Sequence, residues 1–328
     1  MTLPPTLTII IPTYSARGYL PAALDSAARS LGPRDELLVV ANGVTPEYLQ
    51  ELHALVRAPA RLIVLPQAGV AHARNIGLQE ARGSFVLFLD DDDLLVDEGV
   101  AALREALRAH PAWIGVAGGV TRFDESGEQR ADSYRAGGEM LSPLRLLRQS
   151  ITTPGAVLLR AEALRHLGGF DPAHVPTEDF ELWLRVAAAG PLAGIPAHVL
   201  RYRVHPTAVS ANVPRMAAQA LATFRWHARA YGTPRYAAAL RRAAMQLAWC
   251  YRGRLRAAAR KQLREGNVRG VWTCLMLLAQ FQLLVSSYGA RAALWKLRAG
   301  AREEPVGETD ALAFPYLAHS TSNDDVTA

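Results

Sequence analysis

The stretch Phe85-Val86-Leu87-Phe88-Leu89-Asp90-Asp91-Asp92-Asp93 decides which fold the sequence predicts. Its five apolar residues contain no polar position, which is typical of a strand buried on both faces of a sheet. The four carboxylates that follow repel one another unless a cation compensates them, and oxygen ligands of this kind suit Mg²⁺ or Mn²⁺. Because alternate residues of an extended segment point the same way, Asp90 and Asp92 could face one ion together. An acidic surface loop, or a cap of the next helix, is the simpler alternative.

Outward from this strand, apolar runs alternate with helix-like segments. Toward the N-terminus the expected strands are 7–12, 37–40 and 62–65, and the expected helices are 19–31, 46–56 and 71–81. Toward the C-terminus we expect a helix over 98–109, strands over 113–120 and 156–160, a polar loop over 124–139, a helix over 180–189 and an extended segment over 199–205. Such alternation predicts an α/β fold with a mostly parallel central sheet flanked by helices, in which ligands collect beyond the carboxyl ends of the strands.

Charge is distributed unevenly along the 328 residues, whose formal net charge is +6. Residues 1–200 carry a net charge of −6, residues 201–300 carry +17 with Glu265 as their single acid, and residues 301–328 carry −5. A strongly basic segment of this kind indicates an anionic partner. No nucleic-acid recognition motif accompanies the charge, so we expect no nucleic-acid partner.

The basic segment predicts a C-terminal helical region. At 100° per residue, an apolar face opposes an arginine face; the apolar face holds Tyr236, Leu240, Ala243, Leu247, Cys250 and Tyr251, and the arginine face holds Arg241, Arg242, Arg252, Arg256 and Arg260. The next run, 270–290, has no charged residue and is about long enough to cross a bilayer. Polar residues interrupt it, so we expect a buried or in-plane helix there.

Cysteine content and the ends of the chain add further expectations. Two cysteines outside any Cys-x-x-Cys pair argue against a disulfide scaffold and a structural zinc site. We see no secretory signal at the N-terminus and expect a cytoplasmic protein, with a peripheral position at the inner face of the cell membrane as the alternative left open. The domain organisation that follows is a catalytic domain over 1–212, a basic helical region over 213–300 and a disordered acidic tail over 301–328.

Several short motifs occur in an order that resembles the family 2 glycosyltransferases, inverting enzymes with a GT-A fold. They span about residues 7–210: Ile9-Ile10-Ile11-Pro12-Thr13-Tyr14, Asn42-Gly43, Gly69-Val70-Ala71-His72-Ala73-Arg74-Asn75-Ile76-Gly77, Phe88-Leu89-Asp90-Asp91-Asp92-Asp93, Gly168-Gly169-Phe170-Asp171, Glu178-Asp179 and Tyr202-Arg203-Val204-His205. Each motif alone is weak evidence. Their common order and spacing make the resemblance strong, and they favour the metal interpretation of Asp90 and Asp92 over the acidic loop.

The resemblance implies a donor site for a nucleoside-diphosphate sugar, by default a uridine diphosphate sugar. Its nucleotide-sugar-binding residues would be Pro12, Tyr14, Asn42, Arg74, Asp90, Asp91 and Arg203. Asp92, the last acid of the Asp-x-Asp motif, would hold Mn²⁺ or Mg²⁺, with His205 completing the metal site. The alternative for His205 is an ordinary loop histidine.

On the acceptor side, the resemblance implies that Asp179 is the catalytic base, which takes the proton of an acceptor hydroxyl. Helix capping by Asp179 or Glu178 is the alternative, because carboxylates are favourable in the first turn of a helix. Glu178 and Trp183 are expected on the acceptor side, although core packing is the more probable role for Trp183. The acceptor would be a saccharide or a lipid-linked saccharide of bacterial cell-surface polysaccharide or glycoconjugate biosynthesis.

One departure and two alternatives remain open. The family's usual acidic pair is replaced here by Ala41-Asn42, so the nucleobase is in doubt. A non-catalytic nucleotide-sugar-binding protein is the main alternative; a GT-A nucleotidyltransferase fits poorly because residues 1–30 contain only Gly18 and no lysine. Neither Gly-x-Gly-x-x-Gly nor a phosphate loop is present, which argues against a dinucleotide-binding oxidoreductase. For the basic region we hold two hypotheses, attachment to anionic lipid or packing on the catalytic domain.

Overall fold

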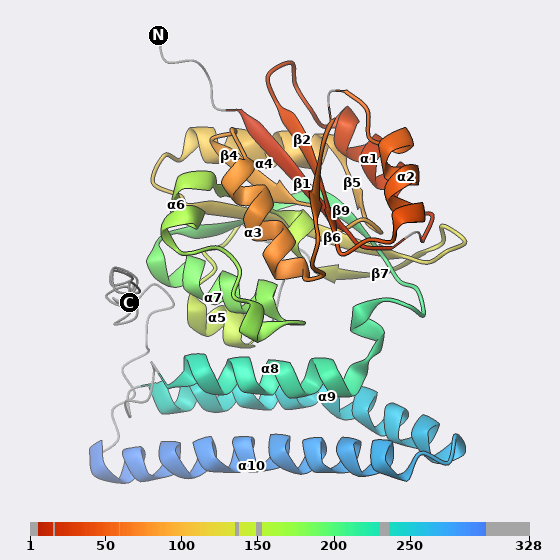
Figure 1. The fold of residues 1–328 in the computed structure, drawn as a ribbon. Helices are drawn as coiled ribbons and strands as arrows, with labels where there is room; N and C mark the ends of the chain where they lie inside the picture. The colour runs from red at the N-terminus through yellow and green to blue at the C-terminus, as the bar shows by residue number, and fades with distance from the viewer. Residues whose placement is uncertain are drawn as a thin grey trace, which may run out of the picture.

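The structure is a computed structural model that describes residues 6–15, 17–58, 60–134, 138–148, 153–229 and 236–299. A nine-stranded sheet forms its centre, in the order β3-β2-β1-β4-β8-β6-β9-β5, with β7 paired to β6 (Figure 1). The strands are β1 Leu7–Thr13, β2 Glu36–Asn42, β3 Ala60–Leu65, β4 Phe85–Phe88, β5 Leu94–Leu95, β6 Gly115–Phe123, β7 Gln129–Tyr134, β8 Val157–Arg160 and β9 Leu192–Arg203. The predicted acidic tail, 301–328, lies outside the described residues.

The sheet is parallel in one half and mixed in the other. Strands β3, β2, β1 and β4 run parallel, as expected. Strand β8 then pairs antiparallel with β4 and with β6, and β5 and β7 are also antiparallel to their neighbours, while β6 and β9 are parallel. The expected mostly parallel sheet is therefore a mixed one. The expected loop over 124–139 is likewise corrected, since β7 forms a hairpin with β6 there.

Helices cover both faces of the sheet. They are α1 Leu20–Arg29, α2 Pro46–Leu55, α3 Val70–Glu80, α4 Asp97–Ala109, α5 Pro143–Arg148, α6 Ala161–His166, α7 Glu178–Ala189, α8 Val213–Ala228, α9 Ala237–Arg264 and α10 Val268–Ala299. Neighbouring strand residues point to opposite faces, so Ile9 joins a core with α1, α2 and α4, whereas Ile10 joins a core with α3, α6 and α7. This two-sided burial explains why β1 and β4 have no polar alternation.

A close approach of α3 to β1 depends on Gly77. A Cβ atom at this position would collide with the Ile10 side chain, so glycine is required for the helix to lie on the strand. This contact places the N-terminal part of α3 beside the carboxyl ends of β1 and β4, where the acidic run begins.

The C-terminal helices form a further layer beneath the catalytic part. Figure 1 shows α8 and α9 between the sheet and α10, which lies along the edge farthest from the sheet. The predicted apolar face of α9 is buried, except for Cys250, which is exposed. The predicted arginine face is exposed.

The sequence predicted either a buried helix or an in-plane helix over 270–290, and helix α10 is not a buried helix. Its segment Val268–Leu294 is long and apolar enough to cross a membrane by length and composition, but only 22% of the best window is buried in the protein. One face packs on α8 and α9, through residues that include Phe281 and Tyr288. The other face is apolar and exposed, with Trp272 and Leu283 each more than half exposed.

Candidate active site

The predicted site residues gather at the carboxyl ends of β1, β2 and β4, joined by the residues that follow β9 and by the first turn of α7. Parallel strands deliver their carboxyl ends to one edge, and β4 carries the acidic run to that edge. The antiparallel β8 lies between β4 and β6, and the long β9 ends beside the acidic run. Motifs more than 100 residues apart in sequence are thereby brought together.

Asp92 and His205 form the central pair of the site. Asp92 Oδ2 lies 2.9 Å from His205 Nε2 and 3.6 Å from an Arg17 guanidinium nitrogen. His205 is 4% exposed, and its Nδ1 lies 2.9 Å from the Thr207 hydroxyl, which holds the imidazole in place. The Arg203 side chain donates to the backbone carbonyl of Asp92 at 2.8 Å.

These residues fit a divalent cation. Mg²⁺ and Mn²⁺ are commonly held by one or two protein ligands together with the phosphate oxygens of a substrate. Asp92 and His205 are close enough to share one ion. Within the residues that the structure describes, no group of three or more His, Cys, Asp and Glu side chains is arranged to hold a metal ion. An ion at Asp92 and His205 would therefore need further ligands from a substrate. A buried carboxylate oxygen, Asp93 Oδ2, also has no hydrogen-bond partner among the described residues.

Crowding and burial make the acidic run difficult to ionise. Burial, and then the Asp92 charge, raise the pKa of Asp91 to about 7 against the opposing hydrogen bond from Thr13. Burial and the charge of Asp90 raise the pKa of Asp92, and burial raises the pKa of Asp93 well above its usual value. A bound cation would offset this electrostatic cost.

Arg74 connects the acidic run with α7. Its guanidinium donates to Asp90 Oδ1 at 2.6 Å and to Glu178 Oε1 at 2.7 Å, and it lies over the ring of Phe170 at 5.1 Å from the centroid. Arg74 is 3% exposed. A buried guanidinium between two carboxylates fixes both in position, because breaking such a contact leaves an uncompensated buried charge.

Asp179 follows Glu178 in the first turn of α7 and is half-buried. Asp179 Oδ1 accepts from the backbone N–H of Phe180 at 2.7 Å. Burial, and then the Glu178 charge, raise the pKa of Asp179 to about 7 although Arg74 opposes this. A carboxylate with a pKa near neutrality has the chemistry of a general base. Thr177, not an acidic residue, is the N-cap of the helix.

Three predicted roles are corrected by the contacts. Asn42 is 3% exposed, its Nδ2 donates to the Thr13 carbonyl and its Oδ1 accepts from the Gly69 N–H, so this buried amide fixes two loops and does not face a nucleobase. Glu178 does not face an acceptor, since it is 5% exposed and paired with Arg74. Trp183 is completely buried in the core, so it offers no platform for an acceptor ring.

The remaining predicted residues, Pro12, Tyr14 and Arg203, differ in how deeply they are buried. Pro12 is buried within β1, opposite Val40 of β2. Tyr14 is 49% exposed at the end of the same strand, and the Arg17 guanidinium lies 4.8 Å from its ring centroid. Arg203 lies over the ring of Tyr19 at 4.6 Å. Tyr14 is therefore the accessible member of the expected nucleotide site on this strand.

The sequence interpretation assigned no role to Thr13 and Arg17. The Thr13 hydroxyl donates to Asp91 Oδ2 at 2.5 Å and lies 2.9 Å from the Tyr48 hydroxyl, which couples β1 to the acidic run. Arg17 approaches Asp92 from the loop after β1. Thr13 is the last residue of β1 and Arg17 lies in the loop after it, so the rule that ligands bind at the carboxyl ends of parallel strands could have indicated both.

Comparisons with known proteins agree with this arrangement. Residues 8–168 match the model of the glycosyl transferase family 2. Among curated proteins, the amylovoran biosynthesis glycosyltransferase AmsE of Erwinia amylovora is 23% identical over 188 residues, which cover 56% of this chain and 70% of AmsE. The chain spans 17% and 39% of the length of the first two curated relatives that it matches.

Solved structures show the same fold at low sequence identity. Staphylococcus aureus TarS 1–349 in complex with UDP-GlcNAc is 15% identical with a TM-score of 0.54, covering 87% of this chain and 92% of that one. The mannosyltransferase PcManGT of Pyrobaculum calidifontis, in complex with GDP-Man and Mn²⁺, is 19% identical with a TM-score of 0.52, covering 92% and 89%. The expected GT-A fold is thus confirmed, and the resemblance to glycosyl transferase family 2 is confirmed over residues 8–168.

Proposed function

We propose that this protein is a metal-dependent inverting glycosyltransferase of the hexosyltransferase type, which moves a sugar from a nucleoside diphosphate to an acceptor hydroxyl. One observation supports the proposal: Arg74 joins Asp90 of the acidic run, which also contains the Asp92 of the Asp92–His205 pair, to Glu178, the neighbour of Asp179. In this proposal, the metal site that holds the donor diphosphate and the carboxylate base lie on opposite sides of one reaction centre.

The donor is proposed to be a nucleoside-diphosphate sugar, with a uridine diphosphate sugar as the first to test. The solved relatives bind two different nucleotides, UDP-GlcNAc in TarS and GDP-Man in PcManGT. Asn42 is engaged with backbone, so Tyr14 is the side chain we expect beside the nucleotide. Asp90 and Asp91 would lie near the ribose.

Mn²⁺ or Mg²⁺ is proposed as the cofactor, held by Asp92 and His205. When bound, it would neutralise the charge that develops on the leaving diphosphate. PcManGT binds Mn²⁺ together with its donor, in support of this assignment. Arg17 and Arg203 add positive charge on the same side, near Asp92.

Asp179 is proposed to accept the proton of the acceptor hydroxyl. The hydroxyl oxygen attacks the anomeric carbon from the face opposite the nucleotide, the bond from that carbon to the diphosphate oxygen breaks, and the diphosphate leaves with the electron pair. The configuration at the anomeric carbon inverts. The acceptor would be a saccharide or lipid-linked saccharide of a bacterial surface polysaccharide, a class that agrees with the amylovoran assignment of AmsE.

Release of nucleoside diphosphate from a panel of donors with Mn²⁺, with Mg²⁺ and with EDTA tests the proposal. We expect turnover only with metal, and a fall of about 100-fold or more in Asp92→Ala and in Asp179→Asn. Asp25→Asn, which changes an exposed aspartate of α1, is the control and should retain full turnover. Undiminished transfer in both site variants would contradict the assignment. Donor binding by the wild type with no turnover over a broad acceptor panel would favour a non-catalytic nucleotide-sugar-binding protein.

A further inference from the structure

Helix α10 presents an apolar stripe that nothing in the described protein covers. Its five most exposed large apolar residues each have more than half of their surface accessible: Val268, Trp272, Met276, Leu283 and Leu294. They recur at intervals of four, four, seven and eleven residues, which correspond to one side of a helix. The opposite side packs on α8 and α9 through Cys274, Leu277, Phe281, Leu284 and Tyr288.

The neighbouring face of α9 combines exposed apolar side chains with arginines. Trp249 is 74% exposed and Met245 48% exposed, and Arg242 and Arg252 lie on the same side of the helix. Within the described residues, neither of these arginines is paired with a carboxylate. A tryptophan among cationic side chains is typical of a helix that lies at a membrane surface.

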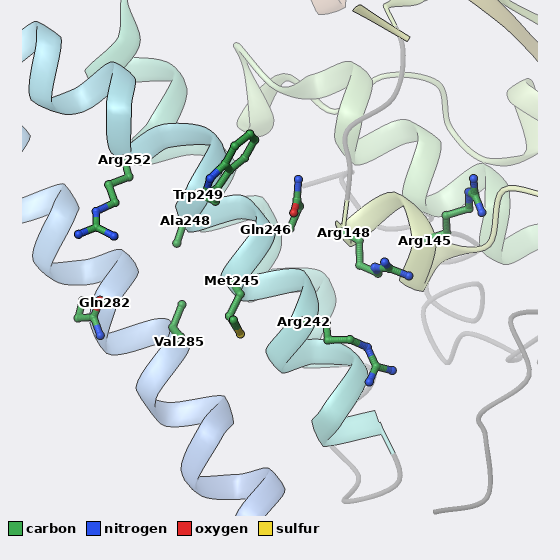
Figure 2. A pocket seen from close by; sticks show the side chains of 10 residues that line it. All are labelled: Arg145, Arg148, Arg242, Met245, Gln246, Ala248, Trp249, Arg252, Gln282 and Val285. Carbon is green, nitrogen blue, oxygen red and sulfur yellow. The ribbon is translucent and has the colours of Figure 1, made fainter. Parts of the chain in front are cut away.

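A hollow of about 690 Å³ lies between α5, α9 and α10, and Figure 2 shows the side chains that line it, these four among them. Arg145 and Arg148 of α5 lie on one side of it, and Gln282 and Val285 of α10 lie on the other. The α10 side of the hollow adjoins the apolar stripe, so the arginine-rich surface and the stripe are continuous. We call the exposed sides of α9 and α10 together the basal face.

Charge determines which partner suits this face. Residues 201–300 carry a net charge of +17 with one acid, Glu265. Two copies packed through this face would bring like charges together, which disfavours a dimer. An anionic bilayer has the opposite charge in its headgroups and apolar chains beneath them, and it matches both components of the face.

Packing argues against insertion of α10 across a bilayer. Phe281 is 2% exposed and stacks on the ring of Tyr251 in α9 at a centroid distance of 5.6 Å. Spanning the membrane would require this whole packed side of α10 to separate from α8 and α9 and lose its burial. Lying in the plane of the interface immerses only the side that is already exposed.

We propose that the basal face docks on an anionic lipid bilayer, with α10 lying in the plane of the interface. The exposed apolar stripe of α10 then lies among the upper parts of the acyl chains, and the arginines of α9 and α5 lie at the lipid phosphates. This docking is independent of the proposed chemistry, since it depends on none of the active-site residues.

The position of α9 suggests what docking would achieve. Helix α9 contacts α5, which in turn contacts α7, the helix that begins with Glu178 and Asp179. The inner side of α9 is therefore connected through α5 to the helix that carries the proposed base, while its outer side is on the basal face. Docking would hold the acceptor side of the site close to the lipid surface, where a lipid-linked acceptor would be found.

Sedimentation with vesicles tests the docking. The full chain would be mixed at low salt with vesicles of phosphatidylcholine alone or of phosphatidylcholine and phosphatidylglycerol at about three to one. We expect at least tenfold stronger binding to the anionic vesicles, weakened by salt. Equal binding to both vesicle types, or no binding to either, would overturn the proposal.

Matched variants separate the apolar from the charged contribution. Leu283→Glu on the stripe should reduce vesicle binding at least tenfold, whereas Leu55→Glu, at an exposed leucine of α2, should not. Arg242→Ala with Arg252→Ala should weaken binding to anionic vesicles more than Arg57→Ala with Arg108→Ala, which removes the same charge from the catalytic part. Circular dichroism checks that each variant folds. Equal effects of a variant pair and its control would contradict the assigned face.

Two other occupants of the face are also distinguishable. A wild-type dimer in sedimentation velocity without lipid, dissociated by Leu283→Glu, would show that a second copy covers the stripe and would overturn the proposal. Vesicle-bound protein that resists extraction by alkaline carbonate would indicate a spanning helix and would overturn the in-plane placement. A monomer that carbonate releases from anionic vesicles is the expected result.

Discussion

Asp179 occupies a position in which its charged form is disfavoured, and this has a consequence for activity. Burial, and then Glu178, raise the pKa of this carboxylate to about 7, and Arg74 only partly opposes them. A base must be deprotonated to accept a proton, so the reaction should require pH values above this pKa. The residue pair Glu178-Asp179 thus combines a fixed ion-pair partner with the proposed base, whose pKa is near neutral pH.

We predict that kcat/KM falls about tenfold per pH unit below pH 7 and levels off above it. Glu178→Gln removes one negative charge beside Asp179, so this limb should move to lower pH. The measurement is a pH profile of nucleoside diphosphate release for the wild type and for Glu178→Gln, with Glu80→Gln as the exposed control. A limb that stays in place in Glu178→Gln would show that another group controls it.

The same pKa shift predicts a stability effect of opposite sign to the activity effect. Between the usual aspartate pKa of about 4 and the folded value near 7, the folded state binds more protons than the unfolded state, so stability is lost as pH rises through this range. At pH 8, Asp179→Asn removes the buried charge and should raise the free energy of unfolding by about 1–2 kcal/mol. Near pH 4 the two proteins should be similar. Thermal denaturation at both pH values is the measurement, and equal destabilisation at both would contradict the argument.

At the scale of elements, α7 is tied to α8 by a buried charge cluster. Glu181 of α7 is 3% exposed; Arg185 donates to it at 2.6 Å, and His227 Nε2 of α8 lies 3.4 Å from it. Burial alone would raise the pKa of Glu181, but His227 and Arg185 together lower it to about 2. This cluster fixes the helix that carries Asp179 to the C-terminal helical layer.

We predict that Glu181→Gln lowers the free energy of unfolding at pH 7 by about 3 kcal/mol, because the half-buried Arg185 loses the buried carboxylate that pairs with it. A carboxylate with a lowered pKa stabilises the fold above its unfolded pKa, near 4.5, and this stabilisation is lost as pH falls toward 2. The variant and the wild type should therefore converge in acid. Chemical denaturation between pH 3 and 8 measures this, with Glu80→Gln, half of an exposed ion pair, expected to change stability by less than about 0.5 kcal/mol. A difference independent of pH would contradict the assignment.

Which elements the sequence could predict depends on where their partners lie. The strands that end at Thr13, Asn42 and Phe88 were predictable because continuous apolar runs mark strands covered on both faces. The antiparallel direction of β8 was not, since a short apolar strand has the same composition in either direction. The hairpin strand β7 was missed because its residues Gln129–Tyr134 are mostly polar.

Within the site, the residue types were predictable and several of their partners were not. Four carboxylates after a buried strand indicate a cation site from sequence alone. The amide of Asn42 bonds Thr13 and Gly69, which are 29 and 27 residues away, and no local pattern shows that both of its groups are used. Trp183 illustrates the same limit, because an aromatic residue one turn after a base can face either the acceptor or the core.

At the scale of the whole molecule, the catalytic and helical parts share one core. A continuous cluster of buried apolar residues extends from Ile10 and Phe88 in the sheet, through α7 and α8, to Phe281 and Tyr288 in α10. The division at residue 212 remains a prediction about function. Sequence could not show which side of α10 joins this core, because the run has no charged residue and its few polar residues do not form one continuous side that would mark solvent.

We predict that the chain unfolds as one cooperative unit and that α10 contributes to its stability through one side only. Phe281→Ala removes a ring that is 2% exposed and stacked on Tyr251, so it should lower the free energy of unfolding of the whole chain by about 3–4 kcal/mol. Leu283→Ala, two residues away and 66% exposed, should change it by less than about 0.5 kcal/mol. Guanidinium denaturation followed by far-ultraviolet circular dichroism and by tryptophan fluorescence gives the comparison. Because the core is continuous, the circular dichroism and fluorescence transitions should shift together in Phe281→Ala. An early transition seen only by circular dichroism would mean that α10 separates without disturbing the sheet. The two parts of the molecule would then be energetically independent.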